Sequence, residues 1–180
     1  MAAAKELGRD KWDALDRFTV SMAHPDAMAA MLSGRSEVNS HFTLPPFTYQ
    51  ELADPRVHRV LSSYDVLGGP STNVLIVATS KFRDANPKTY DAFVAALDQA
   101  MAWIAADKAA AAALYLSATG SKEKLAAVLA QLNDPEIQLT TTPKNIGRYA
   151  DFMADVGSVK DRPASWKDLA FPNLYGLPGS

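Results

Sequence analysis

The first half of the chain contains four stretches whose pattern of apolar and polar positions predicts β-strands. Phe18–Met22 and Glu37–Phe42 alternate between two faces, which is the repeat of a half-buried strand. Val57–Leu61 is a third candidate. Asn73–Thr79 is a continuous apolar run of the kind found inside a parallel sheet. Three or four strands are therefore expected.

The second half is predicted to be mostly helical. Pro87 opens a segment in which apolar residues recur at i, i+3, i+4 and i+7 as far as Ile104. An alanine-rich helix at Lys108–Leu116 is expected to end near Gly120. Further helices are predicted to begin at Ser121 and at Pro143.

Short helices are also predicted among the strands. Ala27–Leu32 follows Pro25 and Asp26 and precedes Gly34, which are the usual signals of a helix start and stop. A helical turn is expected at Thr48–Leu52, and two turns before Gly8. Strands with short helices, followed by a helical C-terminal part, indicate an α/β fold.

Composition narrows the function classes. There are 18 Lys and Arg against 20 Asp and Glu, a net charge of -2, so no basic excess is present to bind nucleic acid. No apolar run approaches the roughly 20 residues that span a bilayer. The N-terminus lacks the basic and apolar regions of a signal peptide. The absence of cysteine excludes disulfides, thiolate catalysis and cysteine-based zinc sites.

Enzyme and metal signatures are not found. The common phosphate-loop, dinucleotide, nucleophile-elbow and zinc-protease motifs are absent. His24, His41 and His58 are evenly spaced, but even spacing across separate elements does not make a metal site. Ser21, His24 and Asp26 lie on one predicted turn, whereas catalytic triads are assembled from separate loops. We expect no catalytic residues, no metal and no cofactor.

Two features remain as candidate binding elements. At Met22–Asp26 a predicted strand leads into a helix whose N-terminal N–H groups could hold an anion, although plain capping by Asp26 explains the same residues. His41 and Phe42 end another predicted strand beside Pro45–Phe47, which suits the rim of a ligand cleft. A histidine satisfied at a strand edge is the alternative.

Several segments together resemble one protein family. They are Phe18–Gly34, Glu37–Phe42 with Pro45–Phe47, Asp54–Val57, Tyr64–Gly69, Val74–Phe82 with Asn86–Lys88, Phe93–Ile104, Tyr149–Phe152 and Ser165–Leu169. In order and spacing they look like the substrate-binding proteins of ABC importers of the nitrate/sulfonate/taurine class, whose fold is that of periplasmic binding protein type 2. The resemblance covers nearly the whole chain.

The resemblance implies two α/β lobes that close on a ligand, with residues 1–68 in the second lobe and residues 69–180 forming a crossover strand and the helical part of the first. It implies binding of a small anionic or heteroaromatic solute in the periplasm, with an ABC-transporter permease as partner. The positions that match the family's cleft are His24, His41, Phe42, Ser71 and Thr72. We expect His41 and Phe42 to share one pocket with Ser71 and Thr72.

The resemblance leaves much of the first lobe without a counterpart here. We therefore expect weak ligand binding and a tendency to self-associate, because helices would lose the strands that they cover. Two other functions stay open. One is an enzyme of the same fold acting on thiamine-pyrimidine precursors, which would need a titratable partner for His41. The other is a helical interaction module built on residues 87–157, which an exposed apolar stripe would favour.

Overall fold

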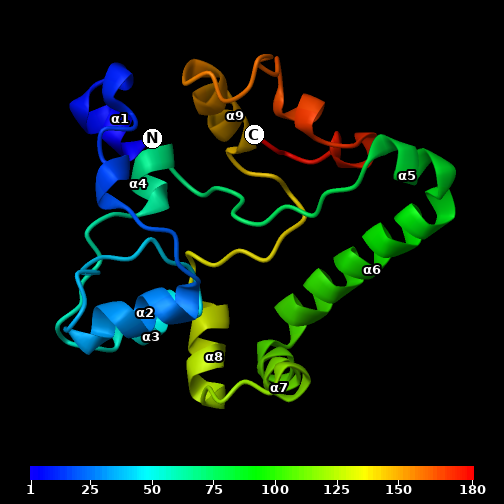
Figure 1. Cartoon of the computed structure of the whole chain (residues 1–180). Coiled ribbons are helices and arrows are strands. Elements are labelled where there is room, and N and C mark those ends of the chain that lie inside the picture. Colours follow the sequence, from blue (N-terminus) through cyan, green and yellow to red (C-terminus); the bar gives the residue numbers. More distant parts are fainter. The chain divides into compact units, whose positions relative to one another are not determined.

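The structure, a computed structural model, describes residues 1–180, and its regular elements are all helices (Figure 1). Helices make up 54% of the chain, and there is no strand or sheet. The expected α/β fold, with the lobes of a periplasmic binding protein, is therefore wrong. This chain is a helical protein.

The α-helices are α1 (Ala2–Leu7), α2 (His24–Ser33), α3 (Phe47–Leu52), α4 (Ser63–Leu67), α5 (Ser80–Ala85), α6 (Pro87–Ala106), α7 (Lys108–Thr119), α8 (Leu125–Asn133) and α9 (Ile146–Asp155). Short 3₁₀ helices lie at Arg9–Lys11, Asp16–Phe18, Trp166–Leu169 and Pro172–Leu174. The longest element is α6, with 20 residues.

The four stretches predicted as strands are not paired with one another. Their apolar side chains are open to solvent: Phe18 is 72% exposed, Val60 80% and Val77 85%. A strand exists only through hydrogen bonds to a neighbouring strand. The strand predictions are therefore wrong, because a local apolar pattern does not supply the partner strand.

The predicted helices at the punctuated positions are confirmed. Pro25 lies in the first turn of α2, and Gly34 ends the helix with φ 63°, a left-handed conformation that favours glycine. Pro87 is the first residue of α6. Helices α8 and α9 start at Leu125 and Ile146, a few residues after the predicted Ser121 and Pro143.

Two short helices were missed, although each has a start signal in the sequence. Ser62 accepts a hydrogen bond from the Tyr64 N–H at 3.2 Å, and the Ser62 N–H donates to Asp65 at 3.3 Å. This reciprocal capping box begins α4. The Thr79 hydroxyl accepts from the Phe82 N–H at 3.1 Å and begins α5.

The chain divides into two compact units. The first unit contains Met1–Gly69 and Phe152–Lys160, and the second contains Pro70–Asp151 and Asp161–Ser180. In the first unit, α2 packs against α3. Trp12 meets the edge of Phe152 with ring centroids 6.5 Å apart, and Arg9 pairs with Asp155 at 3.1 Å.

In the second unit α7 packs against α8, and Ala111, Ala112 and Val128 are buried. The C-terminal residue is also fixed. The Ser180 N–H donates to the Pro143 carbonyl at 3.1 Å, and the Ile146 N–H donates to the Ser180 carbonyl at 2.9 Å.

Helix α6 buries none of its residues. The side chains of its apolar stripe are half-buried or exposed, with Phe93 48% and Trp103 44% accessible. Apart from Phe93 and Trp103, the apolar stripe from Tyr90 to Ile104 is half-buried, so it is only partly open to solvent. The helical interaction module stays a prediction.

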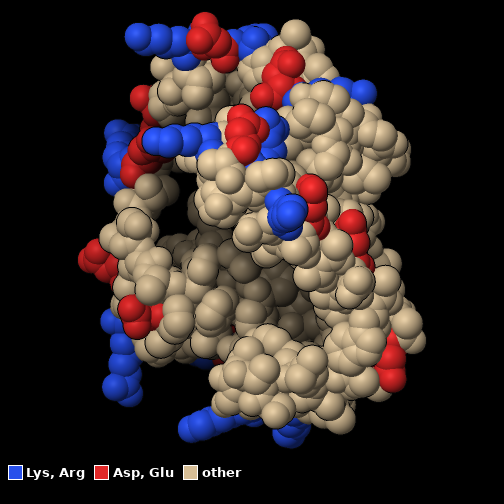
Figure 2. All heavy atoms as spheres, turned by 90° about the vertical axis from the view of Figure 1, so that its right-hand side faces the viewer, with Lys and Arg blue, Asp and Glu red and all other residues tan.

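Buried apolar groups are few. Leu67 is the only large side chain that is completely buried, at 1% exposed. None of the helices combines the length and the apolar character needed to cross a membrane. Acidic and basic side chains are intermixed on the face shown in Figure 2, with broad uncharged areas between them.

Candidate functional site

Two of the residues expected to bind ligand, His24 and His41, lie against each other in the first unit. The His24 Nδ1 atom is 3.0 Å from the His41 Nε2 atom, and the ring centroids are 5.1 Å apart. His24 is the first residue of α2, and His41 lies in the connection from α2 to α3. The structure thus joins two residues 17 positions apart.

A carboxylate completes the arrangement. The His41 Nδ1 atom is 2.6 Å from the Glu51 Oε1 atom, and the two side chains are only 8% and 4% exposed. Glu51 is the only buried charged residue. It lies on α3, and sequence reasoning missed it. We call His24, His41 and Glu51 the histidine cluster.

The contacts of the histidine cluster set its donors and acceptors. An ionised carboxylate only accepts hydrogen bonds, so Glu51 requires a proton on His41 Nδ1. In a neutral His41 the Nε2 atom is then an acceptor, and the proton between the rings comes from His24 Nδ1. The remaining ring nitrogen, His24 Nε2, is an acceptor when His24 is neutral and a donor when it is protonated.

Local structure brings the histidine cluster together. After His41 the chain passes through Pro45 and Pro46, which are joined by a cis peptide bond, and α3 starts at Phe47. The Phe47 ring stacks on the His24 ring, with centroids 5.5 Å apart and planes at 22°. Phe47 of α3 thus stacks on His24, and Glu51, one helical turn further along α3, bonds to His41.

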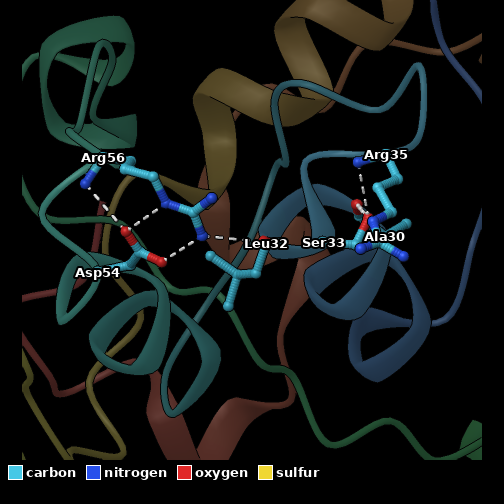
Figure 3. A network of polar contacts seen from close by, with 6 residues as sticks. All are labelled: Ala30, Leu32, Ser33, Arg35, Asp54 and Arg56. Carbon is cyan, nitrogen blue, oxygen red and sulfur yellow. Dashed lines mark hydrogen bonds and ion pairs between the residues drawn. The ribbon is translucent and has the colours of Figure 1, made fainter.

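Arg56 ties the end of α3 to the end of α2 (Figure 3). Its guanidinium donates to the Leu32 carbonyl at 2.9 Å and to both carboxylate oxygens of Asp54, at 3.0 and 2.6 Å. These hydrogen bonds lower the pKa of Asp54 from 3.8 to about 2, and Asp54 in turn raises the pKa of Arg56. The two helices around the histidine cluster are therefore linked at their C-terminal ends.

The other predicted ligand residues are Phe42, Ser71 and Thr72. Phe42 is 83% exposed. Ser71 and Thr72 belong to the second unit. The Thr72 hydroxyl accepts from the Lys144 N–H at 2.8 Å, and the Thr72 N–H donates to the Lys144 carbonyl at 2.8 Å. Thr72 also lines an open cavity of about 320 Å³, together with Asn73, Leu75, Ile146 and Tyr149.

His58, Ser21 and Asp26 were weighed together with the other histidines in the sequence. No three His, Asp or Glu side chains come together as metal ligands. His58 is exposed. His24 bonds to His41, and neither Ser21 nor Asp26 has a hydrogen bond to it. At the start of α2 the N-cap residue is Ala23, which has no capping side chain.

Comparisons with protein families, with curated proteins and with solved structures found no match.

Proposed function

We propose that this chain is the solute-binding component of an ABC importer and takes a small anionic or heteroaromatic molecule at the histidine cluster, without chemical conversion. The observation that supports the proposal is the hydrogen-bonded series Glu51–His41–His24. Two residues expected to contact ligand are in contact with each other. A binding component of this class works in the periplasm beside its permease.

Recognition depends on the ring nitrogen that the cluster leaves for a ligand. The His41 Nδ1 atom bonds to Glu51 Oε1, and the His41 Nε2 atom bonds to His24 Nδ1. Both ring nitrogens of His41 are therefore occupied. His24 Nε2 therefore makes the hydrogen bond to solute. A protonated His24 donates to an oxyanion such as nitrate or a sulfonate, and a neutral His24 accepts from an amino group.

Helix geometry and aromatic side chains add to this selectivity. His24 begins α2, whose first-turn N–H groups carry a partial positive charge that favours anions. The stacked pair of His24 and Phe47 offers a planar surface for a heteroaromatic ring.

Calorimetry with three probes tests the proposal: nitrate, taurine and 4-aminopyrimidine. Wild-type protein is expected to bind at least one of them. His24→Ala removes one ligand hydrogen bond, worth about 1 kcal/mol, and should weaken the affinity roughly fivefold. His58→Ala, which changes the exposed third histidine, is the matched control and should leave the affinity unchanged.

The proposal fails if no probe binds, or if His24→Ala and His58→Ala bind equally well. Circular dichroism of each variant separates loss of binding from loss of structure. Because His24 is only half-buried, its replacement should leave the helical content intact.

A second candidate function is an enzyme that acts on heteroaromatic precursors. An enzyme needs a titratable partner for His41, and Glu51 at 2.6 Å is such a partner. A carboxylate that orients an imidazole is a common general-base arrangement. Proton NMR of 4-aminopyrimidine incubated with the protein distinguishes the two functions: a binder leaves the probe unchanged, and an enzyme consumes it.

A further inference from the structure

Asn73–Thr79 joins α4 to α5 without regular structure and has the longest apolar run among the open segments. Val74, Leu75, Ile76 and Val77 are 74%, 59%, 63% and 85% exposed. The backbone groups of residues 73–78 have no hydrogen-bond partner within the chain. Val and Ile favour strands, so this sequence is suited to pairing and lacks only the second strand.

Both ends of the segment are fixed in the second unit. At the start, Thr72 exchanges two hydrogen bonds with Lys144, each 2.8 Å long. At the end, Thr79 caps α5 through the Phe82 N–H. A segment held at both ends loses less conformational freedom when it binds than a loose terminus does.

We propose that Asn73–Thr79 is a self-association site, where two copies of this chain pair as antiparallel strands. Absence of charge together with an unbroken apolar run distinguishes this segment from the other open ones: Phe18–Met22 also lacks charge, but polar Thr19 and Ser21 interrupt it. Asn73–Thr79 contains no charged residue and no proline. By contrast, Val57–Leu61 contains Arg59 and follows Arg56, so that two copies would bring positive charges together.

The pairing register follows from two-fold symmetry. An antiparallel pair centred on Ile76 places Ile76 opposite its own copy, Leu75 opposite Val77, and Val74 opposite Ala78. The segment carries no charge, and Lys81, the first charged residue after it, already belongs to α5. Every cross-strand pair within Val74–Ala78 is apolar.

Cysteine cross-linking tests the register, because the chain has no cysteine of its own. Ile76→Cys should form a disulfide-linked dimer under mild oxidation, since directly opposed side chains lie within disulfide reach. Val60→Cys is the matched control, at a position 80% exposed in another open apolar segment. It should cross-link at least tenfold more slowly.

Charge exchange tests the same pairing at equilibrium. Ile76→Lys and Ile76→Glu should each raise the dimer dissociation constant at least tenfold in sedimentation analysis, because like charges oppose each other. A one-to-one mixture of the two variants should restore dimers. Val60→Lys should dimerise like the wild type.

Three outcomes would overturn the proposal. The wild type could remain monomeric at all accessible concentrations, which would leave a strand of another protein as the occupant. Val60→Cys could cross-link as fast as Ile76→Cys, as expected of unspecific apolar association. The mixture of charge variants could fail to associate. Calorimetry with the three small probes does not depend on these outcomes. The proposal of self-association and the proposal of solute binding can therefore fail independently.

Discussion

The α2–α3 region and the Asn73–Thr79 segment differ in whether their residues find partners within the chain. In the α2–α3 region, polar groups find partners within about thirty residues: Glu51 holds His41, and Arg56 holds both Asp54 and the Leu32 carbonyl. In Asn73–Thr79 the side chains are mostly apolar, and the backbone of residues 73–78 has no hydrogen-bond partner. Only the polar α2–α3 region thus finds its hydrogen-bond partners within the chain.

The difference shows that hydrophobicity alone does not order a segment. Apolar side chains stabilise a structure only when other apolar surface covers them. A hydrogen bond between near neighbours forms with little loss of chain entropy, whereas a sheet needs distant segments to meet. Three predictions test this comparison, from the largest expected effect to the smallest.

Glu51→Ala should remove most of the order of the α2–α3 region. Removing the buried partner of His41 costs up to about 3 kcal/mol, because the His41 Nδ1–H group stays buried without its hydrogen bond. Denaturant unfolding should show this loss for Glu51→Ala. The control Glu37→Ala changes an exposed carboxylate and should be close to neutral. Equal stability of the two variants would mean that the cluster does not hold the region.

His24→Glu should change ligand selectivity while the region stays folded. A negative charge at the start of α2 opposes an anionic solute and should weaken binding of nitrate or taurine about tenfold, or roughly 1.4 kcal/mol. Binding of neutral 4-aminopyrimidine should change less. Calorimetry of His58→Glu provides the control. Equal losses for all three probes would indicate a structural effect and not a charge effect.

The smallest effect on stability is expected from changing the Asp54–Arg56 ion pair. Because the pKa of Asp54 is lowered from 3.8 to about 2, ionised Asp54 favours the folded state. Its contribution is present above pH 3.8 and is lost as the pH falls to about 2. Asp54→Asn should therefore be less stable than the wild type near about pH 5, and the difference should shrink as the pH falls through about 2. A pH-independent difference would contradict this assignment.

Helix ends were predictable because their signals act within a few residues. Pro25 and Gly34 delimit α2, and the structure confirms both. The capping box from Ser62 to Asp65 is equally local, and it could have indicated α4. The strands were not predictable in this way. Asn73–Thr79 has the composition of a strand, but pairing depends on residues far away in the chain.

The contacts that form the histidine cluster were not predicted. His24 and His41 were expected at one binding site, from resemblance, and their contact is a finding of the structure. Glu51 was missed because a single carboxylate on a short helix normally faces solvent. The turn at Pro45 and Pro46 lies between His41 and α3. No spacing rule connects residues across such a turn.

The alanines of α7 have a consequence for how much substitution the chain tolerates. Ala111 and Ala112 are buried at 7% and 0% exposure, and α7 packs against α8. Side chains larger than a methyl group at these positions have no room and would force the two helices apart. Helix α6 buries no residue, so changes of side-chain size at its exposed positions should be tolerated. Among randomly mutated variants that still fold, side-chain volume at Ala111 and Ala112 should therefore change little. Side-chain volume at the exposed positions of α6 should vary widely.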